Sequence, residues 1–178
     1  TPEQFQAIFD QLVQDGAKAL VFDLRDDGGG LVDALEQILD PLLPEGDIAI
    51  ATYRDGTTKT LVKSDAEECN LPMTVIVNGN TASAAELFTA SLHDFGKASI
   101  VGTQTFGKGI MQVTQTMPGG GALTLTVATY QTTKGECYHK VGITPDEIVE
   151  PGEDAIDYDN PDPEKDPQLK KAIEMVTQ

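Results

Sequence analysis

The stretch that decides the fold runs from residue 78 to residue 112 and reads NGNTASAAELFTASLHDFGKASIVGTQTFGKGIMQ. Apolar residues three and four positions apart predict a helix that begins near Thr81 and ends at Gly96. Thr81 is expected to cap this helix, and Glu86 lies in its first turns, near the positive end of the helix dipole. Residues 98–102 predict a short buried strand that follows directly.

Two reactive side chains bracket this stretch. Ser83 lies on the first turn of the predicted helix, and Lys108 lies between two glycines, where other backbone can approach closely. A glycine-rich loop, RDDGGG at 25–30, follows a different predicted strand, 19–24. A serine, a lysine and free backbone N–H groups are the parts that acyl transfer needs, so we hypothesise a serine hydrolase with a lysine base.

Outside this stretch, apolar periodicity and turn residues predict further elements of both kinds. They are a helix over 1–15 with one buried face (Phe5, Ile8, Phe9, Leu12 and Val13), a central strand over 19–24, a helix from 31 that ends at Pro41 or Pro44, a hairpin over 47–63, a buried strand over 72–77, paired β-rich runs over 110–116 and 122–130, a further run over 141–149, and a helix over 167–176. Strands that alternate with helices favour an α/β fold.

Composition limits the partners. The 178 residues carry a net charge of −17, which makes nucleic acid and anionic membranes poor partners. No cofactor is predicted, and no metal site, because the histidines lack ligand spacing. Cys69 and Cys137 are either a disulfide or free thiols. Acidic residues and prolines dominate residues 146–166, which predict a strap laid over the surface or a disordered run. The acids of residues 157–166 lack the pattern of a calcium loop.

Two other arrangements compete with the Ser–Lys pair. His93 lies ten residues after Ser83 on the same predicted helix, about 15 Å further along, and cannot reach it. His139 stays open as a contact near the site. Residues 102–108 nearly match a phosphate-binding loop, but Gly109 replaces the required Ser or Thr, and β-forming residues follow instead of a helix.

A lysine base has to be neutral to accept a proton. Burial in an apolar pocket disfavours the charged form of an amine. Phe106 is two residues before Lys108 and is the side chain that we expect to help form such a pocket.

Four motifs together resemble the carboxyl-terminal (tail-specific) processing proteases: TASAAE at 81–86, TFGKG at 105–109, DLRDDGGGL at 23–31 and GITPD at 142–146. The likeness covers about residues 5–150 in unbroken order. It implies a Clp protease–crotonase-like α/β core of stacked β-β-α units with an additional β-hairpin. It also implies a serine endopeptidase that works through an acyl-enzyme with a Ser–Lys dyad.

The resemblance assigns roles to individual residues of this sequence: nucleophile Ser83, general base Lys108, lysine-orienting residue Gln112, and oxyanion-hole backbone N–H groups of Ala84 and of Gly29 or Gly30. If residues 108–112 form one strand, the side chains of Lys108 and Gln112 share a face. Gly28 stands where the family often has proline, and Ala85 where a small hydroxyl residue is frequent; neither change removes a catalytic atom.

The resemblance further implies residues 1–150 as a protease core and 151–178 as a strap and helix of the same domain. Protein or peptide substrates and a location outside the cytoplasm are expected, and homo-oligomer formation stays open. The family's upstream PDZ domain and the strand before its first helix have no counterpart here. A non-catalytic peptide- or lipid-binding module on the same fold is the alternative, and an acyl-CoA enzyme is a third hypothesis.

Overall fold

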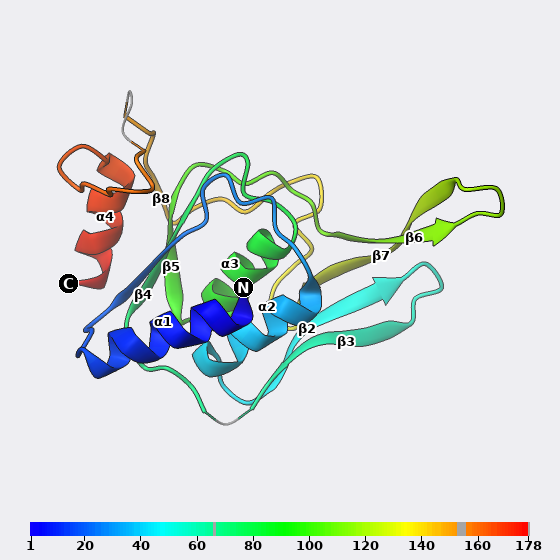
Figure 1. Ribbon diagram of the computed structural model, residues 1–178, viewed down its shortest axis with the longest axis horizontal. Coiled ribbons are helices and arrows are strands. Elements are labelled where there is room, and N and C mark those ends of the chain that lie inside the picture. Colours follow the sequence, from blue (N-terminus) through cyan, green and yellow to red (C-terminus); the bar gives the residue numbers. More distant parts are fainter. Residues whose placement is uncertain (66, 153–155, 178) are drawn as a thin grey trace.

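A computed structural model describes residues 1–65, 67–152 and 156–177 (Figure 1). Helices and strands alternate along most of the chain. In order they are α1 (Pro2–Gln14), β1 (Leu20–Asp23), α2 (Val32–Leu39), the 3-10 turn η1 (Asp40–Leu42), β2 (Gly46–Tyr53), β3 (Thr58–Ser64), β4 (Met73–Val77), α3 (Ala84–Asp94), β5 (Ala98–Gly102), β6 (Ile110–Thr116), β7 (Ala122–Thr132), β8 (Glu147–Ile148) and α4 (Pro167–Val176).

A parallel sheet in the order β1-β4-β5-β8 forms the centre of the molecule. Successive side chains of a strand point to opposite faces, and both faces of this sheet are covered. Val75 and Ile100 pack into the main core with α3, whereas Ile76 and Val101 pack with Ala172 of α4 on the other face. Figure 1 shows α4 on one side of these strands and α3 on the other.

An antiparallel sheet in the order β3-β2-β7-β6 consists of two hairpins. The base of the β6–β7 hairpin, residues 128–132 of β7, pairs with residues 49–53 of β2, which reach the turn of the β2–β3 hairpin. Both hairpins project from the body on the same side, and the β6–β7 hairpin continues beyond the paired region (Figure 1). Both were predicted, and their bounds agree with the sequence pattern to within a few residues.

Three of the sequence predictions need correction. The strand over 19–24 was expected to be central, but β1 pairs only with β4 and ends the described sheet. The run over 141–149 yields only the two-residue strand β8. Helix α1 forms as predicted without a buried residue: Phe5 and Phe9 stack and reach Phe22, while the side with Ile8, Leu12 and Val13 faces solvent.

The C-terminal segment confirms the predicted helix, since α4 spans Pro167–Val176. Part of the predicted strap, 153–155, lies outside the described residues. The part before it pairs through β8 with β5, and the part after it contacts the loop that follows β1. Among the residues that the structure describes, no helix has the length and the apolar content of a membrane span. Cys69 and Cys137 are both free.

Candidate active site

Ser83 lies at the sharp turn between the buried strand β4 and helix α3. Its backbone angles, φ of 59° and ψ of −120°, lie outside the regions that residues other than glycine normally adopt, so the turn is strained. Such a strand–turn–helix junction exposes a serine hydroxyl while its backbone stays fixed. The helix cap is therefore Ser83, not Thr81 as predicted, because Thr81 instead donates its hydroxyl to the carbonyl of Leu24.

The glycine-rich loop after β1 packs directly against this turn. An added Cβ at Gly29 would lie 2.6 Å from the carbonyl oxygen of Ala82 and 2.6 Å from the nitrogen of Ala84, and its φ is +85°. Only glycine allows this approach. The N–H of Ala82 also donates to the carbonyl of Asp27, at 2.9 Å. The structure thus brings Gly29 next to Ser83 and Ala84, which lie more than fifty residues later in the sequence.

The two glycines that were considered for the oxyanion hole differ in their contacts. The N–H of Gly29 donates to the Asp27 carboxyl group at 2.8 Å. No acceptor for the N–H of Gly30 is found among the described residues. Gly30 therefore offers a free donor, whereas Gly29 offers one only when the Asp27 side chain moves away.

Lys108 lies in the loop 103–109, and the carboxyl group of Glu86 anchors this loop. Its Oε1 accepts hydrogen bonds from the Thr105 hydroxyl (2.6 Å) and the Gly107 N–H (2.7 Å). Its Oε2 accepts from the N–H groups of Ser83 (3.0 Å) and Lys108 (2.7 Å). Glu86 is fully buried. A single oxygen atom therefore ties the backbone of the predicted nucleophile to that of the predicted base.

Tyr130 of β7 is a second link between the two residues. Its hydroxyl donates to the Lys108 carbonyl at 2.8 Å and lies 3.5 Å from Ser83 Oγ. The side chain is buried, and burial raises its pKa, so the hydroxyl keeps its proton. The single proton of this hydroxyl goes to the Lys108 carbonyl, so its oxygen can only accept from the Ser83 hydroxyl; no hydrogen bond joins Ser83 Oγ and Lys108 Nζ among the described residues.

Gln112 was expected to share a strand face with Lys108. Strand β6 begins at Ile110, so Lys108 lies in the preceding loop and not on the strand. The exposed side chain of Gln112 donates instead to the Thr126 hydroxyl, at 3.4 Å across the hairpin. Phe106, which was expected to bury the lysine, has 64% of its surface exposed and cannot do so.

The glycines beside Lys108 are needed for close approach, as predicted. A Cβ at Gly107, whose φ is +88°, would lie 2.9 Å from the nitrogen of Gly142. One at Gly109 would lie 3.1 Å from the nitrogen of His139 and 3.4 Å from Cys137 Sγ. His139 thus lies behind the lysine loop, at its backbone. His93 lies at the far end of α3, where its Nε2 is 3.1 Å from Asp146.

An apolar cavity of about 620 Å³ opens beside the serine turn. Among the described residues that line it, Asp27 alone carries a charged side chain, and the others include Phe5, Leu31, Leu35, Ile38 and Phe88. Gly29, Gly30 and Ala84 form its border nearest to Ser83. A cavity of this size and lining can hold an apolar side chain whose neighbouring carbonyl reaches the serine.

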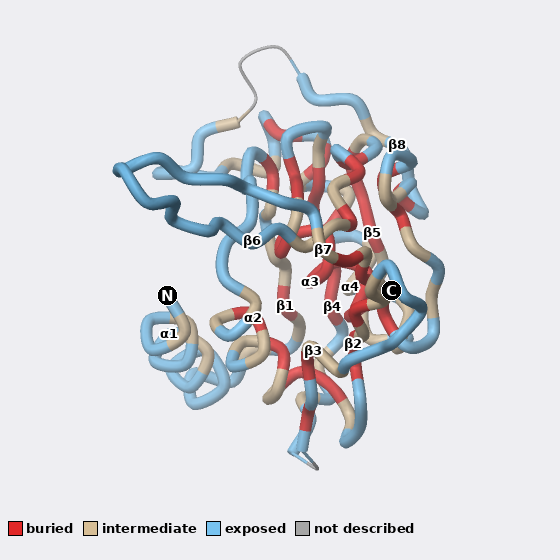
Figure 2. Tube along the Cα trace, turned by 90° about the vertical axis from the view of Figure 1, so that its right-hand side faces the viewer, coloured by how far each residue is buried: buried red, intermediate tan, exposed pale blue. Residues whose placement is uncertain are grey.

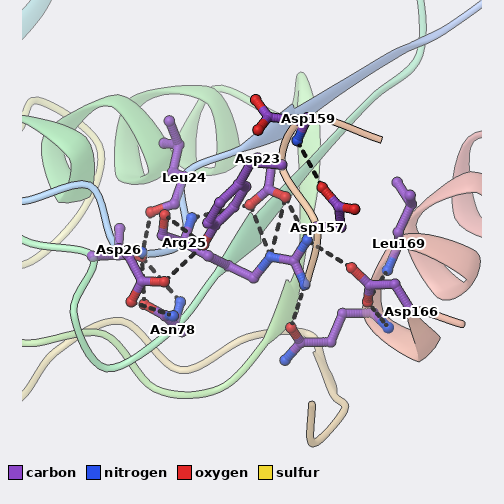
Figure 3. A network of polar contacts seen from close by, with 12 residues as sticks. Asp23, Leu24, Arg25, Asp26, Asn78, Asp157, Asp159, Asp166 and Leu169 are labelled. Carbon is purple, nitrogen blue, oxygen red and sulfur yellow. Dashed lines mark hydrogen bonds and ion pairs between the residues drawn. The ribbon is translucent and has the colours of Figure 1, made fainter. Parts of the chain in front are cut away.

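The glycine loop begins at Arg25, whose side chain is held between two carboxyl groups (Figure 3). Arg25 is buried and forms ion pairs with Asp23 and with Asp166, the cap of α4. Burial opposes its charge, but the hydrogen bonds and attraction from both carboxylates outweigh burial and raise its pKa above the ordinary value. The C-terminal helix is therefore tied to the end of β1.

Asp26, the next residue, joins three segments. Its carboxyl group accepts hydrogen bonds from Asn80 (2.7 Å), Tyr158 (2.7 Å) and Asn78 (3.0 Å). These three donors, Asn80 first, lower the pKa of Asp26. The contacts hold the glycine loop, the serine turn and the described part of the strap in one arrangement.

The sequence did not reveal Glu86 as an anchor, or Tyr130 and Asp26 as links. One signal was available for Glu86, since it is a lone acid between small and apolar residues on a helix that is buried on all sides. Tyr130 stands 47 residues after Ser83 and within a β-rich run, where an aromatic residue is ordinary.

A helix-flanked parallel sheet and a strained serine at a strand–helix turn define a Clp protease-like α/β protein. The model of the family described as "Peptidase family S41" matches residues 1–149 of this chain. The carboxyl-terminal-processing protease of Synechocystis sp. is 35% identical over 167 residues, which cover 94% of this chain and 39% of that protein. The carboxy-terminal processing protease CtpA of Bacillus subtilis is 34% identical over 146 residues, covering 82% and 31%.

Among solved structures, the photosystem II D1 C-terminal processing protease is 34% identical with a TM-score of 0.74, over 83% of this chain and 38% of that one. The chain belongs to peptidase family S41. The predicted family and fold are thereby confirmed. The chain spans between about a third and two fifths of the length of each of these relatives.

Proposed function

We propose that this chain is the catalytic core of a serine endopeptidase that processes proteins from their C-terminal tails. The observation that carries the proposal is the position of Glu86 Oε2, which accepts the backbone N–H groups of both Ser83 and Lys108. Family membership supports the same reaction class. A non-catalytic binding module would have no need for a strained serine whose turn is tied to a lysine loop.

In the proposed reaction, Ser83 Oγ attacks the carbonyl carbon of the substrate while the neutral Lys108 amine takes the hydroxyl proton. The N–H groups of Ala84 and Gly30 stabilise the negative oxygen of the tetrahedral intermediate. The intermediate collapses to an acyl-enzyme as Lys108 returns the proton to the leaving amine. A water molecule then attacks the ester carbonyl with Lys108 as base; the bond to Ser83 Oγ breaks, Lys108 returns the proton to Ser83 Oγ, and the acid is released.

The cavity beside Ala84 supports a preference for an apolar side chain just before the cleaved bond. Lys108 Nζ must move to hydrogen-bond distance of Ser83 Oγ for the reaction. Gln112, on β6, would have to turn toward the lysine to orient it. We keep the division into a core (1–150) and a strap with helix (151–178), and the location outside the cytoplasm, as parts of the proposal.

The test is cleavage of an unfolded reporter protein by the 178-residue chain, by Ser83→Ala and by Lys108→Ala. Labelling of Ser83 by a fluorophosphonate is measured in parallel. We expect cleavage and labelling by the parent and loss of cleavage in both variants. Cleavage by the Ser83→Ala variant would exclude the serine as nucleophile. Folded protein with neither cleavage nor labelling would favour the binding module.

A further inference from the structure

The outer part of the β6–β7 hairpin, residues 110–127, is called the arm here. It projects from the body and is exposed for most of its length (Figures 1 and 2). Its pairing places Val113 opposite Leu125 and Thr114 opposite Thr124. One face is therefore mostly apolar, with Val113, Leu123 and Leu125 each about half exposed and Gln115 opposite Leu123, and the other is rich in threonine.

The arm carries no charge although the chain as a whole is strongly acidic. No charged residue stands between Lys108 and Lys134, in a chain with a net charge of −17. Exposed protein surface normally carries charged residues, and an exposed apolar surface marks an interaction site. This composition suits an uncharged partner.

The two edge strands of the antiparallel sheet also differ in whether they carry charged residues. β3 forms one edge and carries Lys59 and Lys63, charged residues of the kind that prevent a further strand from pairing. β6 forms the other edge and carries neither charge nor proline. Of the two edges of the described antiparallel sheet, β6 is therefore the one left open to strand addition.

The hydrogen bonds at both ends of β6 show which backbone groups face outward. The Met117 N–H donates to Gly121 and the Gly109 carbonyl accepts from Tyr130, so odd-numbered residues of the strand point toward β7. Backbone groups alternate in direction along an antiparallel strand. The N–H and C=O groups of Gln112, Thr114 and Thr116 consequently face away from β7, and no described strand pairs with them.

We infer that the free edge of β6 binds an extended, uncharged segment of the polypeptide substrate as an added strand. The inference rests on the proposed function, because β6 begins two residues after Lys108 and an added strand would run directly to the catalytic pair. Backbone hydrogen bonds supply affinity in this mode of binding, and alternate side chains supply selectivity. A second copy of the chain fits less well, since each copy brings a charge of −17.

The test uses the Ser83→Ala chain, which cannot turn over its ligand, and a fluorescent peptide of ten Ala, Val and Thr residues. Fluorescence anisotropy measures its binding to this chain and to two further variants, Thr114→Pro and Thr60→Pro. Proline removes an outward N–H at either edge without breaking the ladder. The two sites are matched, because each threonine hydroxyl makes one exposed side-chain contact.

We expect Thr114→Pro to weaken binding at least about tenfold, as loss of one or two hydrogen bonds predicts, and Thr60→Pro to change it less than about twofold. The same peptide with every second nitrogen methylated should also bind at least about tenfold more weakly. This second comparison needs no variant of the arm, so it decides the matter even if Thr114→Pro does not fold.

Equal binding by Thr114→Pro and Thr60→Pro, or of the methylated peptide, would overturn the inference. So would a parent that light scattering finds to be a dimer and that Thr114→Pro makes monomeric, since a second copy then occupies the edge. Failure of the proposed function has a separate signature. A fluorophosphonate reacts with an activated serine and does not need the arm, so absent labelling of Ser83 would reject that function while peptide binding still decides on the arm.

Discussion

Ser83 and Lys108 lie within hydrogen-bond reach of one tyrosine hydroxyl, yet they belong to two very different kinds of scaffold. Every residue from 84 to 92 in the helix after Ser83 is buried, whereas β6, the strand after Lys108, has no buried residue (Figure 2). Packing therefore fixes the serine. A small number of polar contacts fixes the lysine, chiefly those of Glu86 and Tyr130.

This difference has a consequence for dynamics. Segments with few buried apolar contacts open at a lower free energy than the core of the same protein. Strand β6 can therefore move more readily than the serine turn, and Lys108 lies two residues before this strand, at the end of the loop that Glu86 anchors. Substitutions at the polar contacts of Glu86 and Tyr130 should therefore displace the lysine loop (the lysine half of the site) before the serine turn and the glycine loop packed on it (the serine half).

The largest effect is expected from Glu86→Gln. Each carboxyl oxygen of Glu86 accepts two hydrogen bonds, and the substitution replaces one of these oxygens by an NH₂ group, which donates. Buried N–H groups then lose their acceptor, at a cost of about 1–3 kcal/mol each. We expect the free energy of unfolding in urea to fall by about 2–4 kcal/mol. The matched control is Glu36→Gln, whose side chain accepts one exposed N–H, from Lys63. A loss no larger than the control's would refute the anchoring role.

The serine half is tested by Gly29→Ala. The new methyl would meet the backbone of Ala82 and Ala84 at 2.6 Å in a conformation with positive φ, so the glycine loop must leave the serine turn. Loss of one oxyanion donor costs about 100-fold or more in kcat, and we expect reporter cleavage to fall that far. Gly28→Ala is the control, since no atom lies within 4 Å of its added Cβ and its φ is not positive. Similar activity in both variants would show that the loop does not form the oxyanion hole.

Tyr130→Phe should have an intermediate effect. It removes the hydrogen bond to the Lys108 carbonyl and the contact with Ser83 Oγ, but leaves the packed ring. We expect kcat to fall about fivefold with KM within about twofold, as for loss of one positioning hydrogen bond of about 1 kcal/mol. Tyr138→Phe is the control, because its ring packs against Tyr130 and the described part of the chain offers its buried hydroxyl no hydrogen-bond partner. An increase in KM alone would instead place Tyr130 in substrate binding.

Much of the framework could be predicted because it follows from local periodicity. Helix α4 and strands β4 and β5 agree with their apolar patterns to within a residue, since each buries a face that the sequence marks plainly. The same pattern misled for α1 and β1. A period shows which face is apolar, but not whether a partner covers it or which strand lies at the edge of a sheet.

The polar contacts of the site could not be predicted for a related reason. Arg25 meets Gln168 across 143 residues of sequence, and Tyr130 meets Lys108 across 22. Hydrogen bonds of this kind depend on the final positions of whole elements, and a single sequence carries no periodic signal for them. The glycine motifs were an exception, because close approach leaves a visible mark in the residue type.

The smallest effect is expected at the edge of the serine half, from Asp26→Asn. Asparagine tolerates the positive φ of 61° at this position, so the exchange mainly removes charge. Because its hydrogen bonds lower the pKa of Asp26 below the ordinary 3.8, the ionised group stabilises the fold above that pH and loses this effect as pH falls through the lowered pKa. We expect the variant to be less stable than the parent at pH 7 by under about 1 kcal/mol, and the gap to narrow as pH falls below 3.8 toward the lowered pKa of Asp26. Unfolding midpoints at pH 7, 5 and 3 measure it. A gap that stays constant would show that amide geometry, not charge, holds the glycine loop, and the serine half would then depend on packing alone.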